Sequence, residues 1–341
     1  MQRAVFLPLL LLLLLFTLSL CVGSVPLTLA EVGQGLFGTT AEAAPGDEAV
    51  AQFIMWESRL PQSLTAVLAG SALALCGLVM QTLFRNPLAD PSLLGVSGGA
   101  SLGASLALLA WGGSLTWGSL ALSGQLLTIG AAFLGAMLVI LLLTLCSRWV
   151  SDSLGLLVIG VMMSFVLSAF ISLLSFFATA DGLRAFVVWG MGDFSSLSFE
   201  RLPLFALCIV VPLVGLFGFA RPLNALLLGE AYAANLGVRV QQVRTLLLLL
   251  IGLLTAVVTA LCGPISFIGL AVPHLARLWL RRADHRHLLP ATALLGADLS
   301  LFALILTHLP GARGTLPLAA VTPLLGAPVV LYLLLRRHRV G

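Results

Sequence analysis

The sequence predicts an all-α integral membrane protein with about ten transmembrane helices. Of its 341 residues, 60% are apolar and only 9% are charged, whereas a soluble domain carries about a quarter charged residues. The apolar residues form long runs separated by charges and by Gly or Pro breaks. A spanning helix needs about 20 apolar residues, and the chain has enough for roughly ten. This composition excludes a soluble enzyme, a nucleic-acid-binding protein and a disordered chain.

The apolar runs divide the chain into ten expected spans. They cover residues 4–25, 60–83, 93–111, 117–147, 154–178, 202–220, 245–262, 265–277, 288–308 and 317–335. The eighth is too short to cross a bilayer, because a helix of about 13 residues rises only about 20 Å. It follows Gly263 and Pro264, so we expect a short broken helix near 265–277. Membranes tolerate such a break only where protein or a water-filled cavity surrounds it.

The arginines orient these spans. All 17 basic residues are arginines, because the chain contains no lysine, and with the N-terminus inside, 13 of them lie on the cytoplasmic side. The four on the outer side are Arg59, Arg184, Arg201 and Arg313. The positive-inside rule therefore predicts a multi-pass protein with both termini in the cytoplasm. Residues 1–23 also resemble a secretory signal peptide, so cleavage of the first span stays open.

The chain is expected to form one transmembrane domain, residues 1–341, with two soluble-facing segments. Segment 25–56 is acidic and lies outside, whereas segment 221–244 lies inside. In the inner segment Asn224 opens one short helix, Gly229 breaks it, and Glu230 opens a second that stops at Gly237. Such a paired elbow is suited to docking. The alternative, an amphipathic loop on the membrane surface, would carry Arg or Lys on its polar face.

Four segments carry polar or helix-breaking residues that hydropathy alone does not explain. They are residues 59–62 (RLPQ), 85–100 (RNPLADPSLLGVSGGA), 228–238 (LGEAYAANLGV) and 263–274 (GPISFIGLAVPH). In this order and spacing they resemble the permease subunits of the FecCD family, the membrane components of ABC importers for ferric siderophores, haem and cobalamin. The resemblance runs from about residue 56 to residue 336 and implies the type II ABC importer permease fold.

The resemblance also implies partners and a location. A second permease copy, in a homodimer or a close heterodimer, would enclose the translocation path at the interface. Two ATP-binding subunits would bind below, and a periplasmic substrate-binding protein would deliver cargo to the bacterial inner membrane. A Walker A loop needs a lysine, so ATP hydrolysis must reside on a partner chain, which binds the ATP and Mg²⁺. We therefore expect no enzyme activity, no cofactor and no metal in this chain.

The family motifs assign roles to three groups of residues. ATPase coupling falls to the elbow residues Leu228, Gly229, Glu230, Asn235, Leu236 and Gly237. The cytoplasmic gate falls to two turns, which contain Asn86, Leu88, Ser151 and Ser153, although each turn could equally be a plain capped turn. Docking of the binding protein falls to Arg59, Gln62, His308 and Arg313.

Some polar residues allow two interpretations. His308 stands where the family has an arginine, so it is either a pH-dependent docking residue or an ordinary interfacial one. Asp298, within the ninth span, is either a proton-relay acid or a buried packing carboxylate. His285 and His287 lie in an arginine-rich loop and are expected to be solvated.

The cargo is the least determined property. A ferric siderophore is the first expectation from the breadth of the family, with haem and cobalamin as alternatives. A proton-coupled secondary transporter would need several intramembrane acids, and Asp298 is the only clear one. An intramembrane enzyme would need a reactive pair at helical spacing, which His274 and His308 lack.

Overall fold

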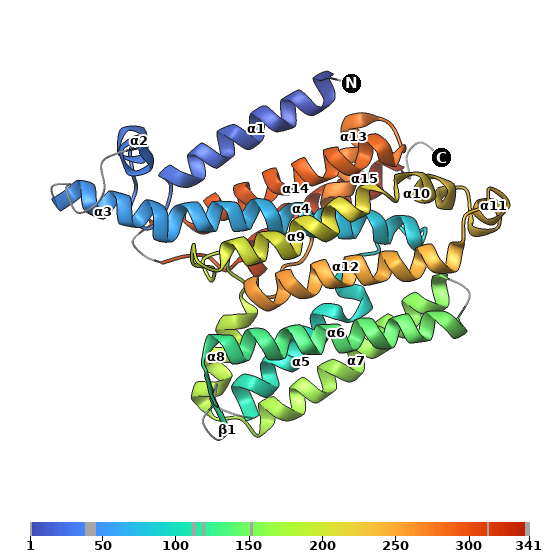
Figure 1. The fold of residues 1–341 in the computed structure, drawn as a ribbon, viewed down its shortest axis with the longest axis horizontal. Coiled ribbons are helices and arrows are strands. Elements are labelled where there is room, and N and C mark those ends of the chain that lie inside the picture. Colours follow the sequence, from blue (N-terminus) through green and yellow to red (C-terminus); the bar gives the residue numbers. More distant parts are fainter. Residues whose placement is uncertain are drawn as a thin grey trace.

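Long apolar helices run side by side along one axis of the molecule (Figure 1). The computed structural model describes residues 2–37, 46–110, 114–117, 120–150, 153–311 and 314–337. Its helices are α1 (Gln2–Cys21), α2 (Leu29–Phe37), α3 (Gly46–Ile54), η2 (Met55–Arg59), α4 (Leu60–Leu83), η3 (Pro91–Leu94), α5 (Val96–Ser105), η4 (Leu106–Ala110), α6 (Gln125–Trp149), α7 (Ser153–Phe176), α8 (Ala180–Gly190), α9 (Leu202–Phe217), α10 (Ala220–Leu227), α11 (Glu230–Asn235), α12 (Val240–Cys262), α13 (Ile268–Leu280), α14 (His285–Thr307) and α15 (Leu318–Arg337).

The number and order of the apolar segments agree with the prediction. Among the described residues, five helices are long and apolar enough to cross a membrane, and α9 with α10 makes a sixth segment that bends by 56°. Four shorter apolar helices cover residues 6–21, 96–110, 268–280 and 318–332. These ten segments follow the ten expected spans along the chain, and the all-α fold class is confirmed for the spans.

Two parts of the chain between the spans differ from the prediction. The expected fourth span begins at residue 117, but strands β1 (Ser114–Trp117) and β2 (Leu120–Ser123) form an antiparallel hairpin there, and α6 begins at Gln125. Helix α8 was not expected either. Its start does carry a cap signal, because Thr179 Oγ1 accepts a hydrogen bond from the Gly182 N–H at 3.2 Å.

The short helix after the break is α13, three residues later than predicted. Helix α12 ends at Cys262, and Gly263 then takes φ 75°, which allows the chain to turn sharply before Pro264. A side chain at Gly263 would meet the carbonyl oxygen of Trp189 at 2.7 Å, so glycine is required at this position. Protein surrounds this break, as the membrane environment demands.

Helix α4 is the centre of the bundle. The end of α3, η2 and α4 form one continuous helix over residues 50–83, and 78% of its apolar 18-residue stretch is buried. Helix α4 packs against α14, α13 and α12. Glycines make these contacts close: a Cβ on Gly77 would overlap the carbonyl of Gly269 in α13, and one on Gly70 would overlap Gly296 in α14. Small residues at such crossings allow helix backbones to approach without lipid between them.

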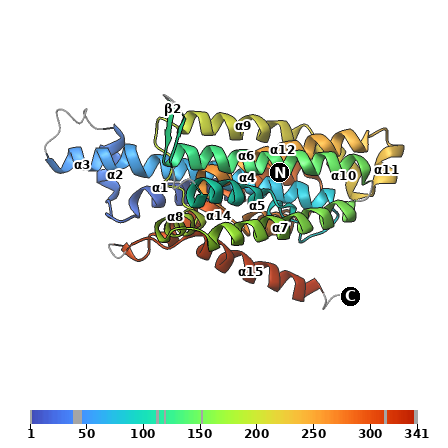
Figure 2. The same ribbon diagram turned by 90° about the horizontal axis from the view of Figure 1, so that it is seen from below.

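Helices α7 and α15 lie on the outside of the bundle, on the same flank (Figure 2). Only 17% of the apolar 18-residue stretch of α7 is buried, although the mean hydropathy of that stretch is 2.5. Helix α15 contributes a groove of about 540 Å³ lined by Phe267, Pro323, Leu324, Ala327, Pro328, Val330 and Leu331. This flank is therefore an extended apolar surface with little cover from the chain itself.

Candidate functional site

The structure contains the predicted pair of short helices, and the first of them begins at Ala220 instead of Asn224. Helices α10 and α11 are joined at Gly229, whose φ of 116° is readily adopted only by glycine. Helix α11 ends shortly before Gly237, which also has a positive φ, 81°. The side chains of Leu228, Tyr232 and Leu236 are 64%, 50% and 60% exposed. Figure 1 places this pair at one end of the bundle, called here the elbow end. The elbow thus presents large apolar side chains at one end of the bundle.

The elbow is fixed to α12 by an ion pair. Glu230, at the start of α11, binds the guanidinium of Arg244, which is only 4% exposed. Ala233, on the inner side of α11, is fully buried. A buried guanidinium that lost its carboxylate would be costly, so this pair holds α11 firmly against α12.

A chain of polar contacts, the polar bridge, joins the elbow to two spans. Asn224 of α10 accepts a hydrogen bond from the backbone N–H of His285 at 2.8 Å, and the same oxygen lies 2.8 Å from the ring Nδ1. The other ring nitrogen, Nε2, lies 2.9 Å from the hydroxyl of Thr82 in α4. In the neutral ring Nδ1 donates to the Asn224 oxygen, so Nε2 is the acceptor that faces the Thr82 hydroxyl. That hydroxyl also lies 2.9 Å from the carbonyl oxygen of Leu78 in its own helix.

The expectation that His285 is solvated is wrong. Its side chain is 1% exposed, because the residue opens α14 and its ring points into the bundle toward α4. His287 is half-buried. Asp284, one residue before the helix, caps its N-terminus: the N–H of Arg286 and then the amide of Asn224 hold the pKa of Asp284 below its usual range.

The first predicted gate turn lies directly after α4. Asn86 Oδ1 accepts the N–H of Leu88 at 2.9 Å, which closes a tight turn, and Leu88 is exposed. His274 of α13 binds the carbonyl of Pro87 at 2.9 Å. Asp90 then caps η3 by accepting the N–H of Ser92 at 2.9 Å, while burial raises the pKa of its carboxyl.

The second gate turn is placed only in part. Ser151 lies outside the described residues, and Ser153 is the first residue of α7. Helix η3, which follows the first turn, packs against α7. The structure therefore brings the first turn and the helix that starts at Ser153 into one region, without defining a contact between the predicted gate side chains.

The residues predicted to dock a binding protein are buried. Arg59 is 4% exposed, and its guanidinium donates to the carbonyls of Val22 and Val25 at 3.0 and 3.1 Å. Gln62 and His308 are also buried. The prediction of an exposed docking surface at these three positions needs correction, because the segment after α1 covers the start of α4. Arg313 lies outside the described residues.

Among the buried polar side chains that have no hydrogen-bond partner within the described structure, two are titratable. They are His308, with both ring nitrogens, and Asp298, with both carboxylate oxygens. Burial and then the positive charge of Arg59 lower the pKa of His308, whereas the charge of Asp193 acts in the opposite direction. Asp298 is confined to the interior of α14, and no partner identifies a proton path.

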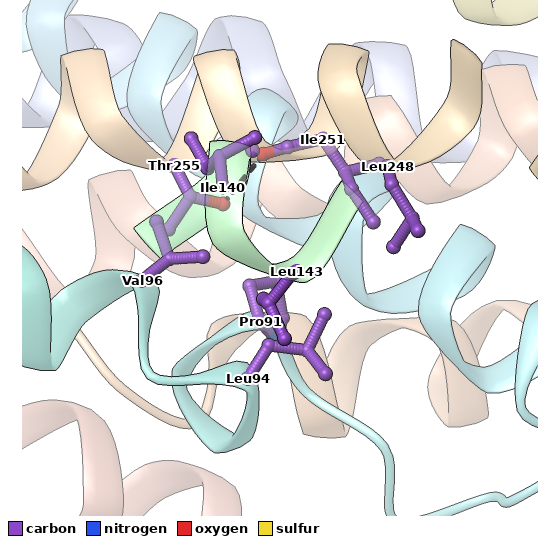
Figure 3. A pocket seen from close by; sticks show the side chains of 9 residues that line it. Pro91, Leu94, Val96, Ile140, Leu143, Leu248, Ile251 and Thr255 are labelled. Carbon is purple, nitrogen blue, oxygen red and sulfur yellow. Dashed lines mark hydrogen bonds between the residues drawn. The ribbon is translucent and has the colours of Figure 1, made fainter. Parts of the chain in front are cut away.

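One cavity inside the bundle is too small to carry cargo. It lies between η3, α6 and α12, and its volume is about 10 Å³, close to that of one water molecule (Figure 3). Its one hydroxyl, on Thr255, donates to Ile251 of its own helix at 2.7 Å. Within the described residues, no group of three His, Cys, Asp or Glu could hold a metal ion.

We expect Arg59 to stabilise the chain rather than to bind another protein. In Arg59→Gln the shorter amide loses the two carbonyls, and a hydrogen bond from a charged group is worth about 2 kcal/mol. The thermal unfolding midpoint in detergent should fall, while Arg184→Gln, an exposed arginine on α8, should leave it unchanged. An unchanged midpoint in Arg59→Gln, with weaker affinity for a binding protein, would restore the docking role.

Comparison with known proteins agrees with this architecture. The profile of the FecCD transport family matches residues 11–336. The vitamin B12 import system permease protein BtuC of Salmonella typhi is 40% identical over 298 residues, covering 87% of this chain and 88% of the relative. BtuC of Salmonella newport (strain SL254) matches with the same identity and coverage.

A solved structure gives the same result. It shows an inward-facing conformation of a transporter assigned to the metal-chelate type of ABC transporters. It superposes with a TM-score of 0.84 at 31% identity, and the match covers 98% of this chain and 100% of the other. The ten apolar segments, the elbow after a bent span and the family profile over nearly the whole length agree, and the chain belongs to the FecCD transport family of ABC importer permeases.

Proposed function

We propose that this chain is the permease of a cobalamin importer. The main support for this proposal is the 40% sequence identity to vitamin B12 permeases across 87% of the chain. This choice reverses the order expected from the sequence, in which a ferric siderophore stood first. The siderophore remains the second candidate, because the structural neighbour is assigned to the metal-chelate type.

A transport assay separates the candidates. The complete importer, with its ATPase and binding protein, would be reconstituted in liposomes and offered radiolabelled cobalamin, a ferric siderophore or haem. We expect ATP-dependent uptake of cobalamin in large excess over the other two. Uptake of the siderophore alone would overturn the cargo and keep the importer. Uptake that persists without the ATPase would favour a secondary transporter.

We propose that the elbow end faces the cytoplasm and carries the ATPase. Described arginines near this end include Arg85, Arg148, Arg221, Arg239 and Arg282, a distribution that the positive-inside rule associates with the cytoplasm. The first residues of α1 and the end of α15 lie toward the same end (Figure 1). The exposed Leu228 and Leu236 would then fit an apolar groove on the ATPase.

The polar bridge would transmit movement of the elbow into the spans. Asn224 moves with α10, and His285 opens α14. Thr82 lies two residues before Phe84, the C-cap of α4, and the turn that holds Asn86 and Leu88 follows directly. A displacement of the docked elbow therefore acts on two spans and on the proposed gate together. Rigid short helices suit this role, because they move without bending.

The apolar flank of α7 and α15 would receive the second permease copy. Its exposed surface is apolar and includes the α15 groove next to Phe267. A path enclosed between two copies also accounts for the small size of the cavity in Figure 3, since cargo need not pass through one chain. The binding protein would approach the opposite end, where α2, α3 and α8 lie and where Arg313 stays a candidate contact.

The ATPase contact predicts a clear effect of charge on the elbow. We expect Leu228→Asp combined with Leu236→Asp to reduce copurification of the ATPase at least tenfold, because two exposed apolar contacts become charged and hydrated. Leu29→Asp, at an exposed leucine of α2 on the opposite end, serves as the control. Pull-down of the co-expressed complex measures the effect. Equal ATPase recovery in both variants would contradict docking at the elbow.

The polar bridge predicts a loss of coupling without a loss of assembly. Thr82→Val keeps the volume of the side chain but removes the hydroxyl that faces His285, so the elbow loses its link to α4. We expect transport per ATP hydrolysed to fall about fivefold, with ATPase copurification unchanged. Thr307→Val is the matched control, since the described structure gives its buried hydroxyl a bond only to Leu304 of its own helix. Parallel loss of transport and ATPase activity in Thr82→Val would contradict this role.

A further inference from the structure

A groove on the side of the elbow borders the proposed coupling residues Leu236 and Gly237. It has a volume of about 460 Å³ and is lined by Arg221, Pro222, Ala225, Leu236, Gly237, Val238, Arg239 and Val243. Its walls are α10, the connection between α11 and α12, and the first turns of α12. We call it the arginine groove.

The lining of the arginine groove is amphipathic. Arg221 and Arg239 are exposed cations, and neither has a hydrogen bond or an ion pair among the described residues. The rest of the lining is apolar and carries no acid. Glu230, the acid of α11, is already paired with Arg244. Two free guanidinium groups above an apolar floor are complementary to an anion that carries an apolar body.

The position of the groove identifies the source of that anion. Helix α9 exposes Leu204, Leu207, Val211 and Val214, which share one face at helical spacing. Helix α9 lies on the outside of the bundle (Figure 2), and Arg221 follows its last residue, Phe217, by four positions. A face of exposed leucine and valine in a membrane protein contacts acyl chains. The cations therefore stand where the apolar span ends, at the level of lipid headgroups.

We propose that the arginine groove binds an anionic membrane phospholipid. Its headgroup phosphate would be held by Arg221 and Arg239, its glycerol region would cover Val238 and Val243, and an acyl chain would follow the exposed face of α9. A lipid held in this way would tie α10 to the start of α12 and so support the elbow from the membrane side. This role does not depend on which cargo the importer carries.

The test uses the full chain, delipidated in detergent and titrated with cardiolipin, phosphatidylglycerol or phosphatidylcholine, with retained lipid measured by native mass spectrometry. We expect the wild-type chain to retain the two anionic lipids in preference to phosphatidylcholine. Removal of each cation should weaken that preference roughly fivefold, so Arg221→Gln with Arg239→Gln should abolish most of it. Arg221→Lys with Arg239→Lys should restore a large part, because charge is kept.

The control removes the same number of charges elsewhere. Arg148→Gln with Arg282→Gln takes two exposed arginines from the elbow end, outside the groove, and should leave the preference intact. Equal loss in the control, or no loss in the groove variant, would overturn the proposal. So would competition by millimolar inorganic phosphate, which would indicate a simple anion site. Loss of ATPase copurification with lipid retention unchanged would assign the groove to the protein partner instead.

Discussion

Backbone contact at the glycines of α4 is the constraint on which the other features depend. In lipid, burial of apolar side chains gives helices little reason to associate, so close packing has to hold them together. Gly70 against Gly296 and Gly77 against Gly269 set how α14 and α13 cross α4. This arrangement brings His285 opposite Thr82 and Arg277 opposite Gln81. Arg277 Nη1 donates a hydrogen bond to Gln81 Oε1 at 2.6 Å. The polar contacts at the elbow end thus depend on spacing fixed by residues without side chains.

Polar residues collect where the spans end, and there they do more than meet water. The elbow reaches the bundle through the Glu230 ion pair and the polar bridge. His274 and Gln81 tie α13 to the turn after α4 and to α4 itself. The result is one connected set of short contacts between a surface element and three spans. Each of these hydrogen bonds and ion pairs is directional. When these helices move relative to one another, specific bonds therefore break or form again, whereas helices in purely apolar contact could slide past each other.

Local features of the sequence were enough to predict the elbow, whereas features that depend on contacts between distant residues were not predicted. Gly229 and Gly237 interrupt a short amphipathic segment, and that signal needs no tertiary information. His285 was misplaced because its partners, Asn224 and Thr82, lie 61 and 203 positions away. Arg59 was misplaced for a similar reason: a charge at the start of a span usually faces water, and only the path of residues 22–25 around it shows otherwise. Strands β1 and β2 are largely apolar in composition, so hydropathy merged part of this region with the span that follows.

The exposed flank of α7 has a consequence for how cargo is recognised. In the proposed dimer, each side chain on that flank occurs twice, related by a twofold axis. A corrinoid lacks such symmetry, so both copies of one residue cannot meet the same chemical group of that cargo. A path of this kind is poorly suited to stereospecific binding and well suited to brief, non-adhesive contact. Discrimination among cargoes then belongs to a protein that meets the molecule before the membrane does.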